Sequence, residues 1–407
     1  MRTSPRLAVW VARALTLATV SSLSAADLTF SLSPAAKDRA GQVIAFKLPS
    51  SAPASPALRD AEGHRLPLQV GSDRTARFLL AWQAAGASPK FTLTIDSSPS
   101  ATEGVKVAPA AGDLAITIGG KAAFSYRMDK EKLPRADIKP EYKRAGYLYP
   151  IFSPAGRLVT DDYPVQHVHH HGIWSPWTKT KFQGREPDFW NMGQKTGTVE
   201  FVALDRTWSG PVAGGFVARH RMVDLSAPAP TTALNETWEV TAYDVPGATQ
   251  PVRMFELVLT QTCATSDPLL LPEYHYGGLG FRGLNQWLGE KNSQFLTSNG
   301  ETNRVKAHAS RVQWINQYGD GEGGGVVGVT LMDHPGNFRS PQPVRVHPKE
   351  PFICFAPSQL GDWSIEPGKP YVGRYRFIIQ DGPPDRALLD AYWAGFAQPA
   401  VVIFGRN

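Results

Sequence analysis

The sequence has few cysteines and, beyond its N-terminal segment, no long apolar run. Cys263 and Cys354 are the only cysteines among 407 residues, which excludes a scaffold built on many disulfides. Both lie in apolar, strand-like runs, and they form either one disulfide or two buried free thiols. No segment beyond residue 26 has the roughly 18 consecutive apolar residues of a membrane span. We therefore expect a mature chain that does not cross a membrane.

The sequence also lacks any run of like charge. Its net charge is +6, but lysine and arginine are scattered along the chain, so we expect no nucleic-acid partner. Hydrophobic residues make up 42% and charged residues 19% of the chain, which is typical of a folded globular protein. The 34 prolines and 37 glycines indicate many turns and little helix.

The N-terminal segment has the layout of a secretory signal peptide. Two arginines precede the mostly apolar run Leu7–Val20, and small residues lead up to Ala26, which predicts cleavage after residue 26. The protein is then secreted or periplasmic. Arg13 interrupts the apolar run, and an uncleaved membrane anchor is the alternative.

The rest of the chain is predicted to be all-β. Residues 27–105 alternate short apolar runs with turns, which predicts a small N-terminal β-sandwich domain. Residues 106–407 carry longer strand signals, with strict alternation in segments such as Asn235–Thr241, and are predicted to form one large antiparallel β-sandwich. The signals for a single C-terminal helix follow Asp385, with apolar residues at helical spacing: Leu388, Leu389, Tyr392, Trp393 and Phe396.

Four of the ten histidines fall within five residues, from His167 to His171. If this segment is a strand, His167, His169 and His171 share one face. Neutral imidazoles at that spacing can bind one divalent metal such as zinc, copper, iron or nickel. Further ligands would come from elsewhere, with three candidates: Asp188, His275 and His334.

The histidine segment has two other interpretations. The rings can instead make hydrogen bonds or pack against tryptophans in a crowded core. A cupin is also all-β with a His-x-His strand, but it needs a carboxylate about four residues after its second histidine. The first acid after His171 is Glu186, so the cupin signature is not met.

Aromatic residues surround this segment. Trp174, Trp177, Phe189 and Trp190 are predicted to offer flat apolar faces to sugar rings.

Two later segments also combine polar and aromatic residues. In the first, Tyr274, His275, Tyr276 and Arg282 suit hydroxyl groups or a carboxylate, although a strand with aromatic partners explains them equally well.

The second segment contains Asp333, His334 and Arg339, shortly before the run Val344–His347. A turn is the simplest interpretation, but an acid, a base and a cation on one loop can also bind substrate.

Taken together, these motifs resemble a secreted bacterial family of unknown function that carries the label "methane oxygenase PmoA". The resemblance covers roughly residues 110 to 382, and its label implies a metal-dependent oxidative enzyme. The motifs that carry it are Gly146–Gly156, Thr160–Pro164, His169–Trp174, Asp188–Trp190, Tyr276–Arg282 and Asp333–Pro335.

The body also looks like a galactose-mutarotase-type β-supersandwich, in which a histidine and a carboxylate act as acid and base on a sugar. His275 with Glu256 or Asp188 would be the counterpart here.

The sequence thus predicts a secreted carbohydrate-active protein, with lyase, epimerase or hydrolase chemistry. Its predicted catalytic residues are His275, Asp188 and His171. A non-catalytic carbohydrate-binding protein and a metal-dependent oxidative enzyme are the alternatives. The predicted substrate-binding residues are Trp174, Trp177, Trp190, Tyr274, Tyr276, Arg282, Asp333, His334 and Arg339, and the predicted metal ligands are His167, His169 and His171.

Overall fold

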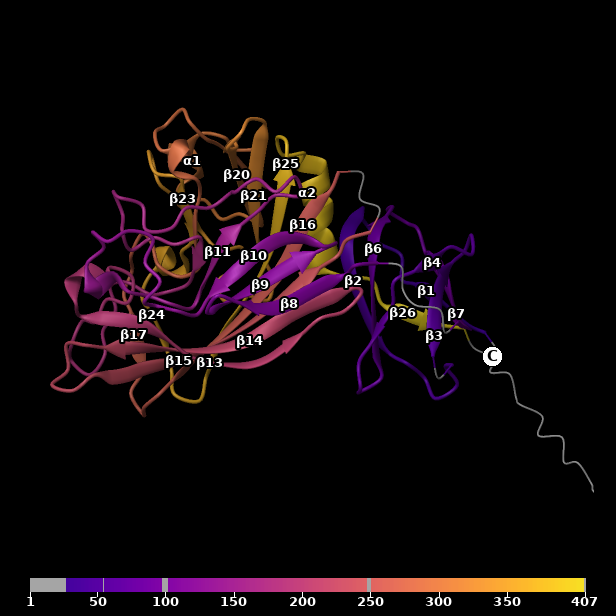
Figure 1. The fold of residues 1–407 in the computed structure, drawn as a ribbon, viewed down its shortest axis with the longest axis horizontal. Coiled ribbons are helices and arrows are strands. Elements are labelled where there is room, and N and C mark those ends of the chain that lie inside the picture. Colours follow the sequence, from indigo (N-terminus) through magenta and orange to yellow (C-terminus); the bar gives the residue numbers. More distant parts are fainter. Residues whose placement is uncertain (1–26, 54, 97–101, 247–249, 406–407) are drawn as a thin grey trace, which may run out of the picture.

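A computed structural model describes residues 27–53, 55–96, 102–246 and 250–405. Long antiparallel strands dominate it, and the described residues form only two α-helices, which confirms the all-β prediction (Figure 1). The segment predicted as a signal peptide lies outside the described residues. None of the helices found in these ranges is long and apolar enough to cross a membrane.

The larger body is a sandwich of two eight-stranded sheets, here called sheet I and sheet II. The strands of sheet I, in spatial order, are β22 (Val344–Val346), β23 (Phe352–Phe355), β18 (Gly280–Arg282), β12 (Ile173–Trp174), β11 (Tyr147–Ile151), β10 (Lys121–Arg127), β9 (Asp113–Ile118) and β8 (Val105–Ala110). Those of sheet II are β13 (Gly197–Trp208), β14 (Ala213–Asp224), β15 (Thr231–Tyr243), β16 (Val252–Cys263), β25 (Tyr371–Asp381), β21 (Val326–Asp333), β20 (Trp314–Asp320) and β19 (Gln294–Thr297).

Alternation along the strands gives sheet I two buried faces. On β12 and β18, Ile173 and Phe281 point into the core between the two sheets, whereas Trp174 points to the opposite, outer face. A second apolar cluster covers that outer face, and loops from several parts of the chain pack onto it. A strand surface covered in this way can hold polar side chains at depth, and the candidate site lies there.

The small sandwich consists of a five-stranded and a three-stranded sheet beside the larger body (Figure 1). Its strands are β1 (Leu28–Leu32), β7 (Lys90–Ile95), β3 (Pro56–Asp60), β4 (Arg65–Leu66), β2 (Arg39–Lys47), β6 (Thr75–Gln83), β5 (Gln69–Val70) and the C-terminal β26 (Val402–Phe404). β26 pairs with β1, with Phe404 opposite Phe30. The chain therefore returns at its end to the sandwich with which it begins.

The predicted C-terminal helix is α2 (Arg386–Ala397), and its N-cap Asp385 accepts a hydrogen bond from the Leu388 backbone N–H. Its buried residues join a cluster that includes Ala40 of the small sandwich and Met254 of sheet II. The helix thus fills the space between the two sandwiches. A short helix, α1 (Arg304–Ala307), and a two-stranded sheet of β17 (Leu269–Leu271) and β24 (Trp363–Ile365) complete the regular elements used below.

The two cysteines do not pair. Cys263 on β16 and Cys354 on β23 are both free, and the second is buried. Of the two alternatives drawn from the sequence, free thiols are the one that the fold adopts.

Candidate active site

The histidine segment is a loop rather than a strand, so the expected alternation is wrong. The Tyr163 backbone N–H donates to His170 O at 3.0 Å, His170 N–H to His167 O at 2.8 Å, and His167 N–H to Pro164 O at 3.0 Å. Backbone groups that bond within their own loop are not available to a neighbouring strand. Residues two apart here need not share a face.

His171 turns away from the other three histidines. Its Nδ1 lies 2.7 Å from Asp162 Oδ1, and its ring stacks on Tyr147, whose hydroxyl donates to Asp162 Oδ2 at 3.0 Å. Burial raises the pKa of Asp162 to about 7 and lowers the pKa of His171 well below its usual value. This fully buried pair fixes the loop to sheet I and is not open to a ligand in this conformation.

The other three rings contact one another. His170 stacks with His167, with centroids 4.8 Å apart, and meets the edge of His169 at 4.8 Å. Underneath, His170 packs on Trp174 and Phe352. Burial lowers the pKa of His169 to about 4 and that of His170 well below its usual value, and it also lowers the pKa of His167. At neutral pH, all three are therefore uncharged.

Trp174 and Trp190 form the floor beneath these rings, and both are fully buried, so in this conformation they offer no face to a sugar. Trp174 and Trp190 contact each other above Gly280, where a Cβ would lie only 3.0 Å from the Trp190 ring. Trp177 and Phe189 belong instead to the core between the sheets, where the Trp177 indole N–H donates to Gln261 Oε1 at 2.6 Å. The expected sugar platforms are thus structural.

A buried ion pair lies beside the histidines. Arg282 Nη1 donates to Glu350 Oε2 at 2.6 Å, and His167 Nδ1 lies 3.6 Å from the same oxygen. His347 Nδ1 accepts hydrogen bonds from the backbone N–H groups of Glu350 (2.8 Å) and Lys349 (3.2 Å). Because that nitrogen accepts, the ring proton of His347 is on Nε2.

Unpartnered polar atoms are concentrated in this region. Buried atoms in a folded protein nearly always have hydrogen-bond partners, and a local excess of unsatisfied ones points to a functional site. Those lacking a partner among the described residues here include Asp161 Oδ2, His167 Nδ1, His170 Nδ1, Trp174 Nε1, Trp190 Nε1, Arg282 Nε and Arg282 Nη2.

Sequence reasoning missed Glu350 and His347 as members of this group. They lie far along the chain from His167, and only the pairing of β22 and β23 with β18 brings them to it. The alternating run Val344–His347, in which Arg345 and His347 alternate with valines, was a signal, but nothing in it indicates which residues it contacts.

Asp188 is a structural anchor at the edge of the site. Its Oδ1 accepts from the backbone N–H groups of Trp190 (2.9 Å) and Asn191 (2.8 Å), and its Oδ2 accepts from Thr178 Oγ1 (2.9 Å) and Asn191 Nδ2 (2.8 Å). Four hydrogen bonds use the lone pairs of this carboxylate. A pocket of about 300 Å³ opens beside it, with Tyr274 and Tyr276 in its lining.

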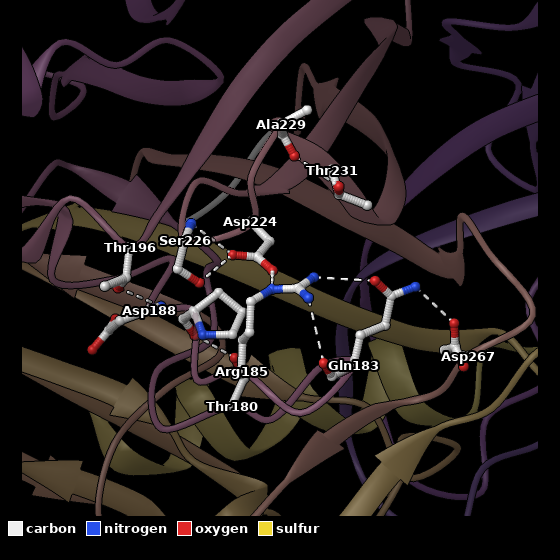
Figure 2. Close-up of polar contacts among 11 residues, drawn as sticks. Thr180, Gln183, Arg185, Asp188, Thr196, Asp224, Ser226, Ala229, Thr231 and Asp267 are labelled. Carbon is white, nitrogen blue, oxygen red and sulfur yellow. Dashed lines mark hydrogen bonds and ion pairs between the residues drawn. The ribbon is translucent and has the colours of Figure 1, made fainter.

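The loop that carries Asp188 is tied to the end of β14. Arg185 Nε donates to Asp224 Oδ2 at 2.7 Å, and Gln183 Nε2 donates to Asp267 at 2.7 Å (Figure 2). At the other side of the loop, the Asp188 backbone N–H donates to Thr196 Oγ1. These contacts hold the pocket wall in one position.

The Tyr274–Tyr276 segment is also a loop, because Gly277 and Gly278 adopt positive φ angles of 123° and 96° and end any strand. His275 is exposed, with its ring against both tyrosines. Tyr276 contacts Trp190 and thereby joins this loop to the histidine cluster.

The third predicted group lies elsewhere. Asp333 accepts hydrogen bonds from Asn337 Nδ2, Ser340 Oγ and the Gln342 N–H, which is the turn that its sequence favours. Arg339 Nη1 donates to the carbonyls of Pro357 and Gly361, both at 2.8 Å.

Neither His334 nor Glu256 reaches the histidine loop. The His334 ring packs on Phe396 of α2, and Glu256 pairs with Arg376 at 2.5 Å. Both residues line a cavity at the α2 end of the sandwich.

The predicted metal set does not fit this geometry. In the described part of the chain, the only group of three or more metal-ligating side chains with converging ligand atoms is Asp60, Glu62 and His64, on the small sandwich. There, Asp60 Oδ1 already accepts from the backbone N–H groups of Glu62 and His64, which makes it a turn. We therefore assign no reaction step to a metal.

Comparison with known proteins gives a family but no activity. The sequence profile of a family described as "Family of unknown function (DUF6807)" matches residues 113–394. No curated protein matches the sequence. One similar structure is a protein in the glycosyl hydrolase family 38 from Enterococcus faecalis, with a TM-score of 0.47 and 11% identity over 93% of this chain and 47% of that chain.

Another is an alpha-mannosidase from Enterococcus faecalis V583, with a TM-score of 0.44 and 13% identity over 93% of this chain and 46% of that chain. The chain thus spans less than half the length of either protein. At these scores, neither likeness contributes to the argument about function.

Proposed function

The chain belongs to DUF6807, a family of unknown function, and we propose that it is a carbohydrate-directed enzyme in which His167 moves a proton. The observation that carries the proposal is the arrangement of His167 beside Glu350, which Arg282 holds in place. This places a neutral imidazole, a carboxylate and a fixed cation at one surface of sheet I.

His167 has the properties of a general base. Its side chain is 33% exposed, while its Nδ1 is buried and faces Glu350, so Nε2 is the nitrogen that a ligand can reach. Burial lowers the pKa of His167, and Glu350 acts in the opposite direction. The ring is thus free to accept a proton near neutral pH, and Glu350 stabilises the cation that then forms.

Neighbouring groups suit a ligand rich in hydroxyls. His347 presents Nε2–H as a donor, and the neutral ring of His169 both donates and accepts. A separate pocket beside Asp188, lined by Tyr276 and by none of these histidines, has polar walls and, at about 300 Å³, is as large as the smaller ligand sites of proteins. These features support a sugar better than an apolar ligand.

The proposed base differs from the three residues that the sequence predicted to be catalytic. His275 is exposed, His171 is bonded to Asp162, and the carboxylate of Asp188 already accepts four hydrogen bonds. The secreted or periplasmic location and the lyase, epimerase or hydrolase class are part of this proposal. The location rests on the signal-like N-terminal segment, and the reaction class rests on a histidine base.

The test is to incubate purified protein with defined neutral and acidic oligosaccharides and to follow them by NMR. The wild type should convert at least one of them, and His167→Gln should lower the rate about 100-fold or more without changing the melting temperature. Exposed His64→Gln on the small sandwich is the matched control. A wild type that binds an oligosaccharide but never converts it would make the protein a binding module instead.

A further inference from the structure

Arg345 differs from Arg282, which lies on the same face of sheet I and has a carboxylate 2.6 Å away. Within the described residues, the partly exposed guanidinium of Arg345 has neither a hydrogen bond nor an ion pair. A partly buried cation without a counter-charge is costly to keep, and such a group commonly serves to bind an anion.

The fold directs this side chain to the candidate site. On β22, Val344 and Val346 face the core between the sheets, and so Arg345 between them faces outward. Across the sheet, Arg345 is opposite Cys354, and Cys354 is opposite Gly280. Gly280 is in turn opposite Trp174, so Arg345 and Trp174 lie in the same cross-strand row on the outer face of sheet I.

Three histidines from separate segments surround Arg345. His347 is two residues away on the same segment, and His275 belongs to the loop before β18. His308 is held beside β22, because the Ala309 N–H donates to Val344 O at 2.8 Å. Burial lowers the pKa of all three, and the charge of Arg345 acts in the same direction. Among the described residues, the Nδ1 atom of His308 is buried and has no hydrogen-bond partner.

In the part of the chain that the structure describes, the acidic groups that interact electrostatically with Arg345 are the Cys354 thiol and the hydroxyls of Tyr276 and Tyr274, and no carboxylate is among them. Neutral imidazoles and phenols can donate hydrogen bonds to an oxyanion without repelling it, and a guanidinium binds two of its oxygens at once.

We propose that Arg345, with His308, His347 and Tyr274 around it, forms a subsite for an oxyanion carried by the ligand. The group is a carboxylate, as in an acidic sugar, or a sulfate or phosphate ester. As a statement about the substrate, this rests on the proposed carbohydrate function. As a statement about anion binding, it does not depend on that function.

The first experiment uses simple anions. Sodium acetate, sulfate and phosphate are titrated into the wild type, Arg345→Gln and the control Arg219→Gln, an exposed arginine on β14 paired with Asp205, and affinities come from NMR shifts. At least one anion should bind the wild type and the control equally and bind Arg345→Gln at least 10-fold more weakly. Which anion binds best separates a carboxylate from a sulfate or phosphate ligand.

The second experiment compares glucuronate with glucose. The wild type should prefer glucuronate at least 10-fold, and Arg345→Gln should lose that preference. Arg345→Lys keeps the positive charge but loses the paired N–H donors of the guanidinium, so its preference for glucuronate should lie between those of the wild type and Arg345→Gln. This second variant keeps the test valid if Arg345→Gln does not fold.

The outcomes distinguish the two proposals. Anion affinities that are undetectable in the wild type, or unchanged in Arg345→Gln, would overturn the subsite even if sugars bind. Simple anions that bind through Arg345 while neither sugar binds would support the subsite and count against the carbohydrate function.

Discussion

Arg282 and Glu350 form a buried ion pair at 2.6 Å across 68 residues of chain. Arg282 is on β18 and Glu350 precedes β23, the next strand of sheet I. The same Glu350 oxygen lies 3.6 Å from Nδ1 of the candidate base, His167.

Breaking this pair should destabilise the protein strongly. Glu350→Ala leaves the buried Arg282 without a counter-charge, and we expect a loss of about 3–5 kcal/mol in the free energy of unfolding. Chemical denaturation followed by circular dichroism measures it. The double variant Arg282→Met/Glu350→Leu should recover much of the loss, and a double variant as unstable as Glu350→Ala would contradict this account.

Stability should fall as the pH drops below about 6.5. Burial lowers the pKa of His169 and of His347 to about 4 in the folded protein, while the unfolded chain takes up these protons near pH 6.5. Between pH 6.5 and 4, only the unfolded state gains the proton, so each histidine removes up to about 1.4 kcal/mol per pH unit. Below pH 4, this contribution to the pH dependence ends.

Urea denaturation at several pH values checks this. His169→Gln should flatten the dependence between pH 6.5 and 4.5, whereas His64→Gln, at an exposed position, should leave it unchanged. A pH dependence of equal slope in wild type and His169→Gln would refute the buried, neutral state of His169.

Gly280→Ala should disturb the tryptophan floor. The added Cβ would lie 3.0 Å from the Trp190 ring and 3.2 Å from that of Trp174, and overpacking of this kind costs about 1–3 kcal/mol. Tryptophan fluorescence and the melting temperature measure it. Gly405→Ala, where a Cβ would meet nothing within 4 Å, is the control and should have no effect.

Asp188→Ala should lower the stability of the protein, because Asp188 has a structural role. Its four hydrogen bonds hold the Thr178–Asn191 loop, and their loss should cost about 2–4 kcal/mol, since hydrogen bonds to charged groups are worth about 1.5–3 kcal/mol each and do not add fully. Denaturant titration gives the value. A variant of normal stability that is nonetheless inactive would return Asp188 to the catalytic residues.

The sequence was sufficient for the fold class and for the α2 helix, because both follow from local patterns. Alternation in Asn235–Thr241 and the helical spacing from Leu388 to Phe396 depend only on neighbours a few residues apart. The same local patterns also located the segment in which the histidines gather.

The composition of the site could not be predicted in this way. His167 and His171 point in different directions because a turn, and not a strand, joins them. Glu350 reaches His167 only through strand pairing across sheet I. The burial of Trp174 and Trp190 depends on loops that pack over the sheet. Each of these outcomes depends on contacts between distant segments.

The pairing of β26 with β1 has a consequence for biosynthesis. Phe30 lies before the larger body in the sequence, whereas its strand partner, Phe404, follows that body and is made only after it. During translation, the small sandwich must wait with an unpaired edge on β1 until the whole larger body has been synthesised. The small sandwich is therefore expected to be completed only after the larger body, and truncation before residue 402 should leave β1 as an unpaired, aggregation-prone edge strand.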